Sequence, residues 1–241
     1  MKAFDLSIHK TYLTNILMDI YKNPYLCNSL GFKGGTAAML FYGLPRFSVD
    51  LDFDLTLPVS PESDEAKKIV ASLTELLESR FKLQDQSLKF NTLFWAVSYG
   101  EGTKQIKVEV STRKQPYNTY DLKPFYGITV KVSQIRDMIA HKMIAILERK
   151  TLASRDIFDT HYFLSSNYAV DINYEIIKDR LNQSPEDFYK ILIRFLGSID
   201  RRNILEGLGE LVDEKQKYWI KNKMLDELKG LIERQLELKA Y

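Results

Sequence analysis

Residues 32–55, FKGGTAAMLFYGLPRFSVDLDFDL, contain the pattern that decides the fold of this chain. A glycine pair, Gly34–Gly35, comes directly before an apolar segment that predicts a short helix over residues 37–42, with Thr36 as its N-cap. From residue 49 to residue 57, apolar and polar side chains alternate strictly, as in a strand with one buried face. The sequence therefore predicts a glycine turn, a short helix and then a half-buried strand.

The polar face of this strand is acidic, because Asp50, Asp52 and Asp54 occupy alternate positions. Side chains two residues apart lie roughly 6.6–6.8 Å apart along a strand, so Asp50 and Asp52 can converge on one cation or on a pair of cations. Six acidic residues and no basic residue lie between Asp50 and Glu65, so we expect Mg²⁺ to supply the counter-charge. The alternative is the solvated face of an amphipathic strand, but aspartate is depleted in strands, and three at alternate positions favour a functional role.

The glycine pair and Thr36 would present backbone N–H groups and a hydroxyl at the positive end of a helix dipole, where phosphate binds. The alternative is a tight turn without a ligand. The order of the elements favours phosphate binding, because a later strand over 105–111 carries Glu109 on its polar face. Together, the glycine turn, the paired carboxylates and Glu109 can hold a triphosphate and two metal ions.

Composition and charge exclude several classes of protein. The 241 residues carry 34 basic and 32 acidic side chains, and a formal net charge of +2 is too balanced to attract nucleic acid or an anionic membrane over the whole surface. A single cysteine, Cys27, excludes an intrachain disulfide. The first 13 residues lack the apolar core of a signal peptide, and no apolar run approaches the ~20 residues of a membrane span. We therefore expect a cytoplasmic protein without a membrane segment.

The three histidines have no metal-ligand spacing and are interpreted as surface or packing residues.

The pattern changes along the chain from mixed helix and strand to helix alone, which predicts two domains of an α+β protein. In the first part we expect a helix over 8–21 that Asn23–Pro24 ends, a loop over 58–61 and a helix over 66–77 that covers the sheet. Strands are expected over 88–99, 105–111 and 127–132, the first two forming a hairpin around 100–102. Ser133 is expected to cap the next helix, and the helices of the second part are expected over 133–149, 154–165, 172–181, 185–198, 201–212 and 218–238.

Residues 32–55 resemble the signature of the AbiEii/AbiGii-type nucleotidyltransferase toxins, a branch of the DNA polymerase beta-like superfamily whose pattern is a glycine pair, a spacer and Asp-x-Asp. A second block of this family follows in the expected order, as Lys142-x-x-Ala145-x-x-x-Arg149 and then Arg155-Asp156-x-x-Asp159. The resemblance covers roughly residues 30–165, and the remaining residues match only as generic helices. It implies a polymerase beta-like mixed sheet with helices over 1–130, and a helical domain over 131–241 that contributes to the active-site cleft.

The resemblance also implies an activity, transfer of a nucleotide from an NTP, and roles for individual residues. Asp50 and Asp52 would bind two Mg²⁺ ions, with Glu109 as the third carboxylate, near the acceptor hydroxyl. The triphosphate would be bound by Gly34, Gly35, Thr36, Lys142 and Arg149, with Lys33 and Arg46 as further candidates. The biological role would be the toxin of a toxin–antitoxin or phage-abortive-infection pair, with a cognate antitoxin and with tRNA or protein as acceptor.

The second block also supports this interpretation from its residues alone. Lys142 and Arg149 fall within the apolar stripe of their predicted helix, where a core helix should not place two cations. They either extend to the rim of the bundle or contact a triphosphate. Asp156 and Asp159 are neighbours at i and i+3, and we expect them to orient these cations by ion pairing, the alternative being that they cap the helix start.

These observations favour a Mg²⁺-dependent nucleotidyltransferase, because nucleotidyl transfer needs positioning and charge neutralisation more than covalent chemistry. Lys142 is counted with the three carboxylates as a catalytic candidate. Two alternatives remain. One is a nucleotide- or protein-binding module without catalysis, and the other is a phosphotransferase that moves the gamma phosphate and would have identical site residues.

Overall fold

The computed structural model describes residues 5–57, 63–89, 91–100 and 104–239. The chain divides into two compact units. Met1–Gly43 and Phe47–Ser133 form the first, called the sheet unit here, and Leu44–Arg46 and Gln134–Tyr241 form the second, called the helical unit. The short segment Leu44–Arg46 therefore belongs to the helical unit, although it lies in the middle of the stretch that decides the fold.

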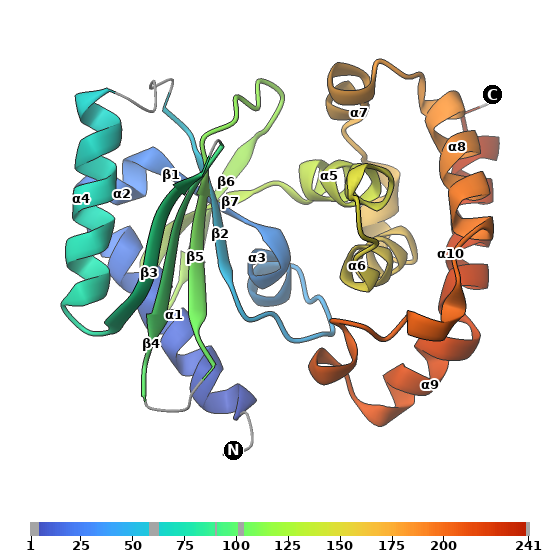
Figure 1. The fold of residues 1–241 in the computed structure, drawn as a ribbon. Helices are drawn as coiled ribbons and strands as arrows, with labels where there is room; N and C mark the ends of the chain where they lie inside the picture. The colour runs from blue at the N-terminus through green and yellow to red at the C-terminus, as the bar shows by residue number, and fades with distance from the viewer. Residues whose placement is uncertain (1–4, 58–62, 90, 101–103, 240–241) are drawn as a thin grey trace. The chain divides into compact units, whose positions relative to one another are not determined.

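The sheet unit is built on a seven-stranded mixed sheet with the strand order β3-β4-β5-β2-β1-β7-β6 (Figure 1). Its strands are β1 Leu30–Lys33, β2 Leu51–Leu55, β3 Lys82–Lys89, β4 Thr92–Ser98, β5 Ile106–Ser111, β6 Tyr120–Phe125 and β7 Ile128–Ser133. The β2–β5 and β1–β7 pairs are parallel and the others are antiparallel. This arrangement, followed by the helices of the second unit, confirms the predicted α+β fold class.

Helices cover both faces of this sheet (Figure 1). They are α1 Leu6–Lys22, α2 Pro24–Ser29, α3 Gly34–Phe41 and α4 Asp64–Glu78. The first two and α4 lie on one side, and α3 lies on the other, against β1 and β2. The predicted helix over 66–77 is confirmed as α4, which buries Ile69, Leu73 and Leu77. Each of these side chains contributes about 1.5–3 kcal/mol by leaving water.

Asn23 explains the junction between the first two helices. Its backbone N–H donates to carbonyls at the end of α1, and its side-chain oxygen accepts hydrogen bonds from Tyr25 N and Leu26 N at 2.9 and 3.1 Å. Pro24 then occupies the first position of α2, where its missing N–H costs nothing. The expected end of the first helix at Asn23–Pro24 is confirmed, and α2, which the sequence did not predict, leads the chain into β1.

Two strand predictions differ from the structure, and one strand was not predicted. The acidic strand is shorter than 49–57, since β2 is Leu51–Leu55, and the predicted strand over 88–99 comprises the end of β3 and all of β4. The hairpin of β4 and β5 is confirmed by their antiparallel pairing, although residues 101–103 of its turn, like the predicted loop over 58–61, lie outside the described residues. Strand β6 was missed because it contains Pro124, which is tolerated at a sheet edge.

The helical unit contains α5 Ile135–Glu148, α6 Ser154–Leu164, α7 Tyr174–Leu181, α8 Pro185–Gly197, α9 Glu214–Asn222 and α10 Met224–Glu237. Three short 3₁₀ turns, at Asn167–Val170, Arg201–Asn203 and Gly209–Leu211, connect them. The N-cap of α5 is Gln134, while Ser133 ends β7, so the predicted cap at Ser133 is wrong.

Two helix predictions in this unit also need correction. The expected helix over 201–212 contains two 3₁₀ turns, and the expected helix over 218–238 is split at Lys223 into α9 and α10. A capping box explains the earlier start of α9: the Asp213 carboxylate accepts from Gln216 N at 2.8 Å, while the Gln216 side chain accepts from Asp213 N at 2.9 Å.

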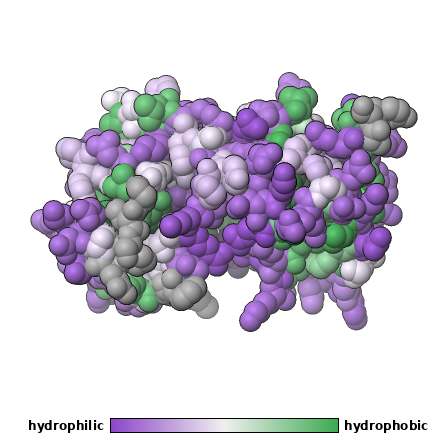
Figure 2. All heavy atoms as spheres, turned by 90° about the horizontal axis from the view of Figure 1, so that it is seen from above, coloured by the Kyte–Doolittle hydropathy of each residue, from purple (hydrophilic) through white to green (hydrophobic). Residues whose placement is uncertain are grey.

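No helix among the described residues combines the length and apolar character that a membrane crossing requires. On the face shown in Figure 2, hydrophilic residues predominate and hydrophobic ones form small, separate groups.

Candidate active site

Gly34 brings the backbone of the turn between β1 and α3 against the carboxylate of Asp52. Its φ of +78° lies in the left-handed region, which side chains other than glycine rarely adopt. A Cβ atom placed on Gly34 would lie 2.9 Å from the Cβ of Asp52 and closer still to its Oδ2. Both the backbone angle and the lack of space therefore require glycine here, and the start of α3 lies beside an acidic side chain.

Thr36 does not cap α3, so this prediction is wrong. The helix begins at Gly34, its N-cap is Lys33, and Lys33 makes no side-chain capping hydrogen bond. Thr36 is fully buried in the first turn of the helix, and its hydroxyl donates to the backbone carbonyl of Asp50. The N–H groups at the start of α3 thus receive no side-chain cap, while the Thr36 hydrogen is committed to the segment that enters β2.

Two of the predicted carboxylates lie on neighbouring strands of the sheet, and the third lies directly before one of these strands. Asp52 pairs in register with Glu109 on the parallel strand β5, and Asp50 lies directly before β2. All three are half-buried, and the buried side chains of β5 are Ile106, Val108 and Val110, as predicted. Because strands lie about 4.8 Å apart, side chains of an in-register pair are near neighbours on one face.

These residues fit a hard divalent cation, because carboxylate oxygens are the ligands that Mg²⁺ prefers. Among residues 5–57, 63–89, 91–100 and 104–239, however, no three His, Cys, Asp or Glu side chains are arranged so that they could together hold a metal ion. The structure therefore supplies neighbouring carboxylates, and binding of a metal would require their side chains to converge.

Asp54 differs from the other aspartates of β2, because it is buried with an exposed fraction of only 1%. It forms an ion pair with Lys33 of the neighbouring strand β1 and accepts hydrogen bonds from Tyr120 Oη at 2.8 Å and from Asn118 Nδ2 at 3.1 Å. At Asp54 the counter-charge is therefore Lys33 of the neighbouring strand, whereas Mg²⁺ was expected to supply it for this acidic run. The sequence count covered only residues after Asp50, whereas the sheet brings Lys33 beside the strand.

Five charged residues of the helical unit form a second group, called the ionic cluster here: Arg46, Lys142, Arg149, Asp156 and Asp159. Lys142 Nζ lies 2.8 Å from both Asp156 Oδ1 and Asp159 Oδ2. Arg149 Nε lies 2.6 Å from Asp156 Oδ2. Arg46 donates through Nε and Nη2 to both oxygens of Asp159, at 2.6 and 2.7 Å. Three cations and two carboxylates leave the cluster with one excess positive charge.

The buried members of the ionic cluster are held in their charged forms. Burial alone would raise the pKa of Asp159, but Lys142 and Arg46 lower it below its ordinary value. Burial likewise opposes the charge on Lys142, yet Asp159 and Asp156 raise its pKa. Removing one member of such a buried pair costs about 3–5 kcal/mol, so these contacts fix the cluster firmly.

The cations of the cluster differ in exposure. The Arg46 side chain is 2% exposed and the Lys142 side chain 18%, whereas the Arg149 side chain is 51% exposed. Arg46, predicted as a nucleotide-binding candidate, is thus a buried partner of Asp159. Its position in the loop between α3 and β2 gave no signal of this pairing, which joins residues 113 positions apart.

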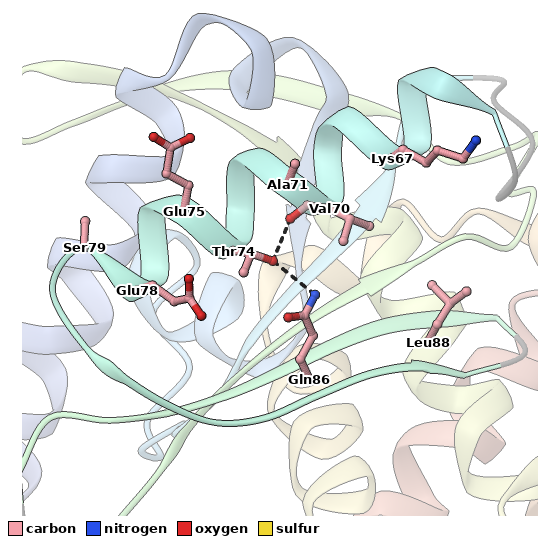
Figure 3. A pocket seen from close by; sticks show the side chains of 9 residues that line it. All are labelled: Lys67, Val70, Ala71, Thr74, Glu75, Glu78, Ser79, Gln86 and Leu88. Carbon is pink, nitrogen blue, oxygen red and sulfur yellow. Dashed lines mark hydrogen bonds between the residues drawn. The ribbon is translucent and has the colours of Figure 1, made fainter.

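The groove shown in Figure 3 lies between α4 and β3 and contains none of the predicted site residues. Thr74 Oγ1 donates to the Val70 carbonyl at 2.8 Å and accepts from Gln86 Nε2 at 3.1 Å and from Trp95 Nε1 at 3.0 Å. These bonds tie α4 to the edge of the sheet, so the polar lining of this groove has a structural explanation.

Comparison with known families decides the relationship that the glycine turn and the carboxylates suggest. A family model described as "Nucleotidyl transferase AbiEii toxin, Type IV TA system" matches residues 16–228. The chain belongs to this family. The match confirms the resemblance and extends it in both directions beyond residues 30–165, so the AbiEii pattern includes most of the C-terminal helices as well as both groups of charged residues.

Solved structures support the fold. The chain is similar to JHP933 from Helicobacter pylori, with 19% identity, a TM-score of 0.63 and coverage of 99% of this chain and 97% of that one. It is also similar to a protein described as a putative nucleotidyltransferase from H. pylori, with 22% identity, a TM-score of 0.58 and 97% coverage of both chains. No curated protein sequence matches the chain significantly.

Proposed function

We propose that this AbiEii-family chain is a Mg²⁺-dependent nucleotidyltransferase that moves a nucleoside monophosphate from an NTP to an acceptor hydroxyl. In this reaction the acceptor oxygen forms a bond to the alpha phosphorus, the bond from that phosphorus to the bridging oxygen breaks, and pyrophosphate leaves. The observation that carries the proposal is the close approach of the Gly34 backbone to the Asp52 carboxylate, with Glu109 in register on the next strand.

Asp50, Asp52 and Glu109 would hold the metal ions, since Asp52 and Glu109 offer oxygen ligands in register on neighbouring strands and Asp50 lies directly before β2. Two Mg²⁺ ions, when bound, stabilise the attacking and leaving oxygens of an in-line displacement. Glu109 would lie nearest the acceptor and accept the proton of its hydroxyl. The N–H groups of Gly34 and Gly35 at the start of α3 would donate to the beta and gamma phosphates.

The ionic cluster of the helical unit would supply cations for the triphosphate. Arg149 is best suited to direct contact because half of its side chain is exposed, while Lys142 would act from between the two carboxylates that orient it. The excess positive charge of the cluster supports this role, because the transferred group and the leaving pyrophosphate are anionic.

The family supports a biological role as the toxin of a type IV toxin–antitoxin system. We propose that the chain acts in the cytoplasm, that its acceptor is an RNA such as tRNA, with protein as the second candidate, and that a cognate antitoxin opposes it.

The experiment that tests this function follows labelled phosphate. Purified protein is incubated with Mg²⁺, total cellular RNA, cell extract and each NTP labelled at the alpha phosphate. Asp52→Asn is the inactive variant, and Asp64→Asn, at an exposed position on α4, is the matched control. Label in RNA or in protein that depends on Asp52 supports the proposal and identifies the acceptor.

Two other results would point to the alternatives. If no alpha label is transferred, the reaction is repeated with NTP labelled at the gamma phosphate, and transfer of that label would indicate a phosphotransferase. NTP binding without any transfer of label would indicate a binding module that lacks catalysis.

A further inference from the structure

The backbone around Asp50 is bound by side chains of two helices and not by a neighbouring strand. Strand β2 begins at Leu51, and its pairing with β1 and β5 includes neither Val49 nor Asp50. Buried backbone carbonyls in such a segment need hydrogen-bond donors from elsewhere in the protein. Two side chains provide them: His9 Nε2 lies 2.9 Å from the Val49 carbonyl oxygen, and the Thr36 hydroxyl donates to the Asp50 carbonyl.

His9 is a buried residue, and each of its two ring nitrogens lies within hydrogen-bonding distance of a partner. It lies in α1, 41 positions before Asp50, and its exposed fraction is 0%. Its Nδ1 lies 3.0 Å from the Tyr99 hydroxyl, and its ring makes edge contacts with Phe47 and Tyr99. Since a carbonyl oxygen can only accept, Nε2 carries the hydrogen. The bond to Tyr99 at the other nitrogen fixes the orientation of the ring.

The two bonds control the direction of the Asp50 side chain. The Val49 carbonyl belongs to the peptide plane before the Cα of Asp50, and the Asp50 carbonyl belongs to the plane after it. Peptide planes are rigid, so fixing both carbonyls fixes φ and ψ at Asp50 and with them the direction of its Cβ. A donor on α1 and a donor on α3 therefore fix the direction in which the Asp50 side chain leaves the backbone.

We propose that His9 is a positioning residue of the active site, which, with Thr36, aims the Asp50 carboxylate toward the metal position that Asp50 shares with Asp52. This inference rests on the proposed function, since it assumes that these two aspartates bind the metal. It assigns no contact between His9 and substrate or metal, because the imidazole is completely buried.

The test compares substitutions that differ in the donor alone. His9→Gln keeps an N–H that reaches toward Val49, whereas His9→Met has nearly the same shape and lacks it. Leu13→Ala, one turn further along α1 at another buried position, is the control for general loosening of this helix. Mn²⁺ affinity of the full chain is measured by calorimetry in the presence of nonhydrolysable alpha,beta-methylene analogues of the four NTPs, together with the melting temperature of each variant.

We expect His9→Met to weaken Mn²⁺ binding about 10-fold, the lower end of the effect of residues that orient metal ligands. His9→Gln should restore most of the affinity, and Leu13→Ala should lower the melting temperature without changing the affinity. Equal Mn²⁺ affinity in folded His9→Met and wild-type protein would overturn the inference. So would a loss in Leu13→Ala as large as in His9→Met.

Two further variants separate the possible failures. If His9→Met does not fold, Tyr99→Phe, which removes the partner of Nδ1, should weaken Mn²⁺ binding in the same direction, and an unchanged affinity would overturn the inference. Asp50→Asn tests the underlying function: unchanged Mn²⁺ binding in this variant would overturn the proposed metal site itself. A loss in Asp50→Asn without a loss in the His9 or Tyr99 variants would overturn only the role of His9.

Discussion

Replacement of Gly34 by alanine should reduce catalysis strongly, because the new side chain would collide with Asp52. The new Cβ would lie 2.9 Å from the Cβ of Asp52, a distance that real Cβ contacts do not show, so either the turn or the aspartate must move. Restoring ordinary contact requires a displacement on the order of 1 Å. A misplacement of that size in a catalytic group can reduce the rate about 100-fold.

Gly127 provides a matched control for the cost of the backbone conformation. Its φ of +82° is close to the +78° of Gly34, but a Cβ there would meet nothing within 4 Å. Both substitutions should therefore destabilise the protein by about 1–2 kcal/mol through the left-handed conformation, and Gly34→Ala should cost more because of the collision.

The two variants are compared by urea unfolding and by transfer of alpha-labelled phosphate at saturating Mg²⁺ and NTP. Gly127→Ala should keep its transfer rate, and Gly34→Ala should lose at least about 100-fold while remaining folded. Equal rates in the two variants would refute the argument that the Gly34 backbone and the Asp52 carboxylate form one site.

Three further predictions concern the buried charges. Asp54→Asn should destabilise the sheet unit by about 1–3 kcal/mol in urea unfolding, because Lys33 loses its partner, while Asp121→Asn, at a half-buried edge-strand position, should change little. Asp159→Asn should destabilise the helical unit by about 3–5 kcal/mol, and a change below 1 kcal/mol would contradict the described ionic cluster. The pKa of Asp159 is lowered in the folded protein, so its charged carboxylate stabilises the fold at pH values above the ordinary pKa of 3.8. This stabilisation is lost as the pH falls through the pKa of the folded state. The stability difference between wild type and Asp159→Asn should thus stay constant from neutral pH to about 5 and narrow below 3.8.

The sequence predicted correctly those helices and strands that depend on residues close to one another along the chain. The helices α4 and α8 have strong apolar periodicity, α8 also has the start signal Ser184–Pro185, and both appear close to their predicted positions. The order of glycine turn, short helix and acidic strand was also predicted, because it depends on Gly34 and on strict alternation in a stretch of only 24 residues.

Contacts between distant residues were not predictable in this way. Lys33 neutralises Asp54 only because β1 and β2 pair, and no spacing along the chain reveals that pair. Likewise, Arg46 lies in the loop before the acidic strand β2, whereas its partner Asp159 lies in α6. His9 was interpreted as an ordinary surface or packing residue, and only the folded backbone shows that its imidazole bonds to Val49.

The split of the last predicted helix has another cause. Periodicity alone favours one long helix over 218–238, because apolar residues recur across Lys223 without interruption. Lys223 instead leaves the helical conformation, with φ −131° and ψ −35°, and ends α9. Helix α10 then buries Leu228 and Ile232 and packs against α6 and α8. Tertiary packing decides such cases, since short helices draw most of their stability from it.

Metal-dependent nucleotidyl transfer at Asp52 can be measured as the transfer of alpha-labelled phosphate by wild-type protein and by Asp52→Asn, with Mg²⁺ present or chelated. We expect label on RNA or protein with wild-type protein and Mg²⁺, and none after the substitution or after chelation. Equal labelling by wild type and Asp52→Asn, or labelling that continues without a divalent cation, would contradict the claim that these carboxylates carry a metal-dependent nucleotidyl transfer.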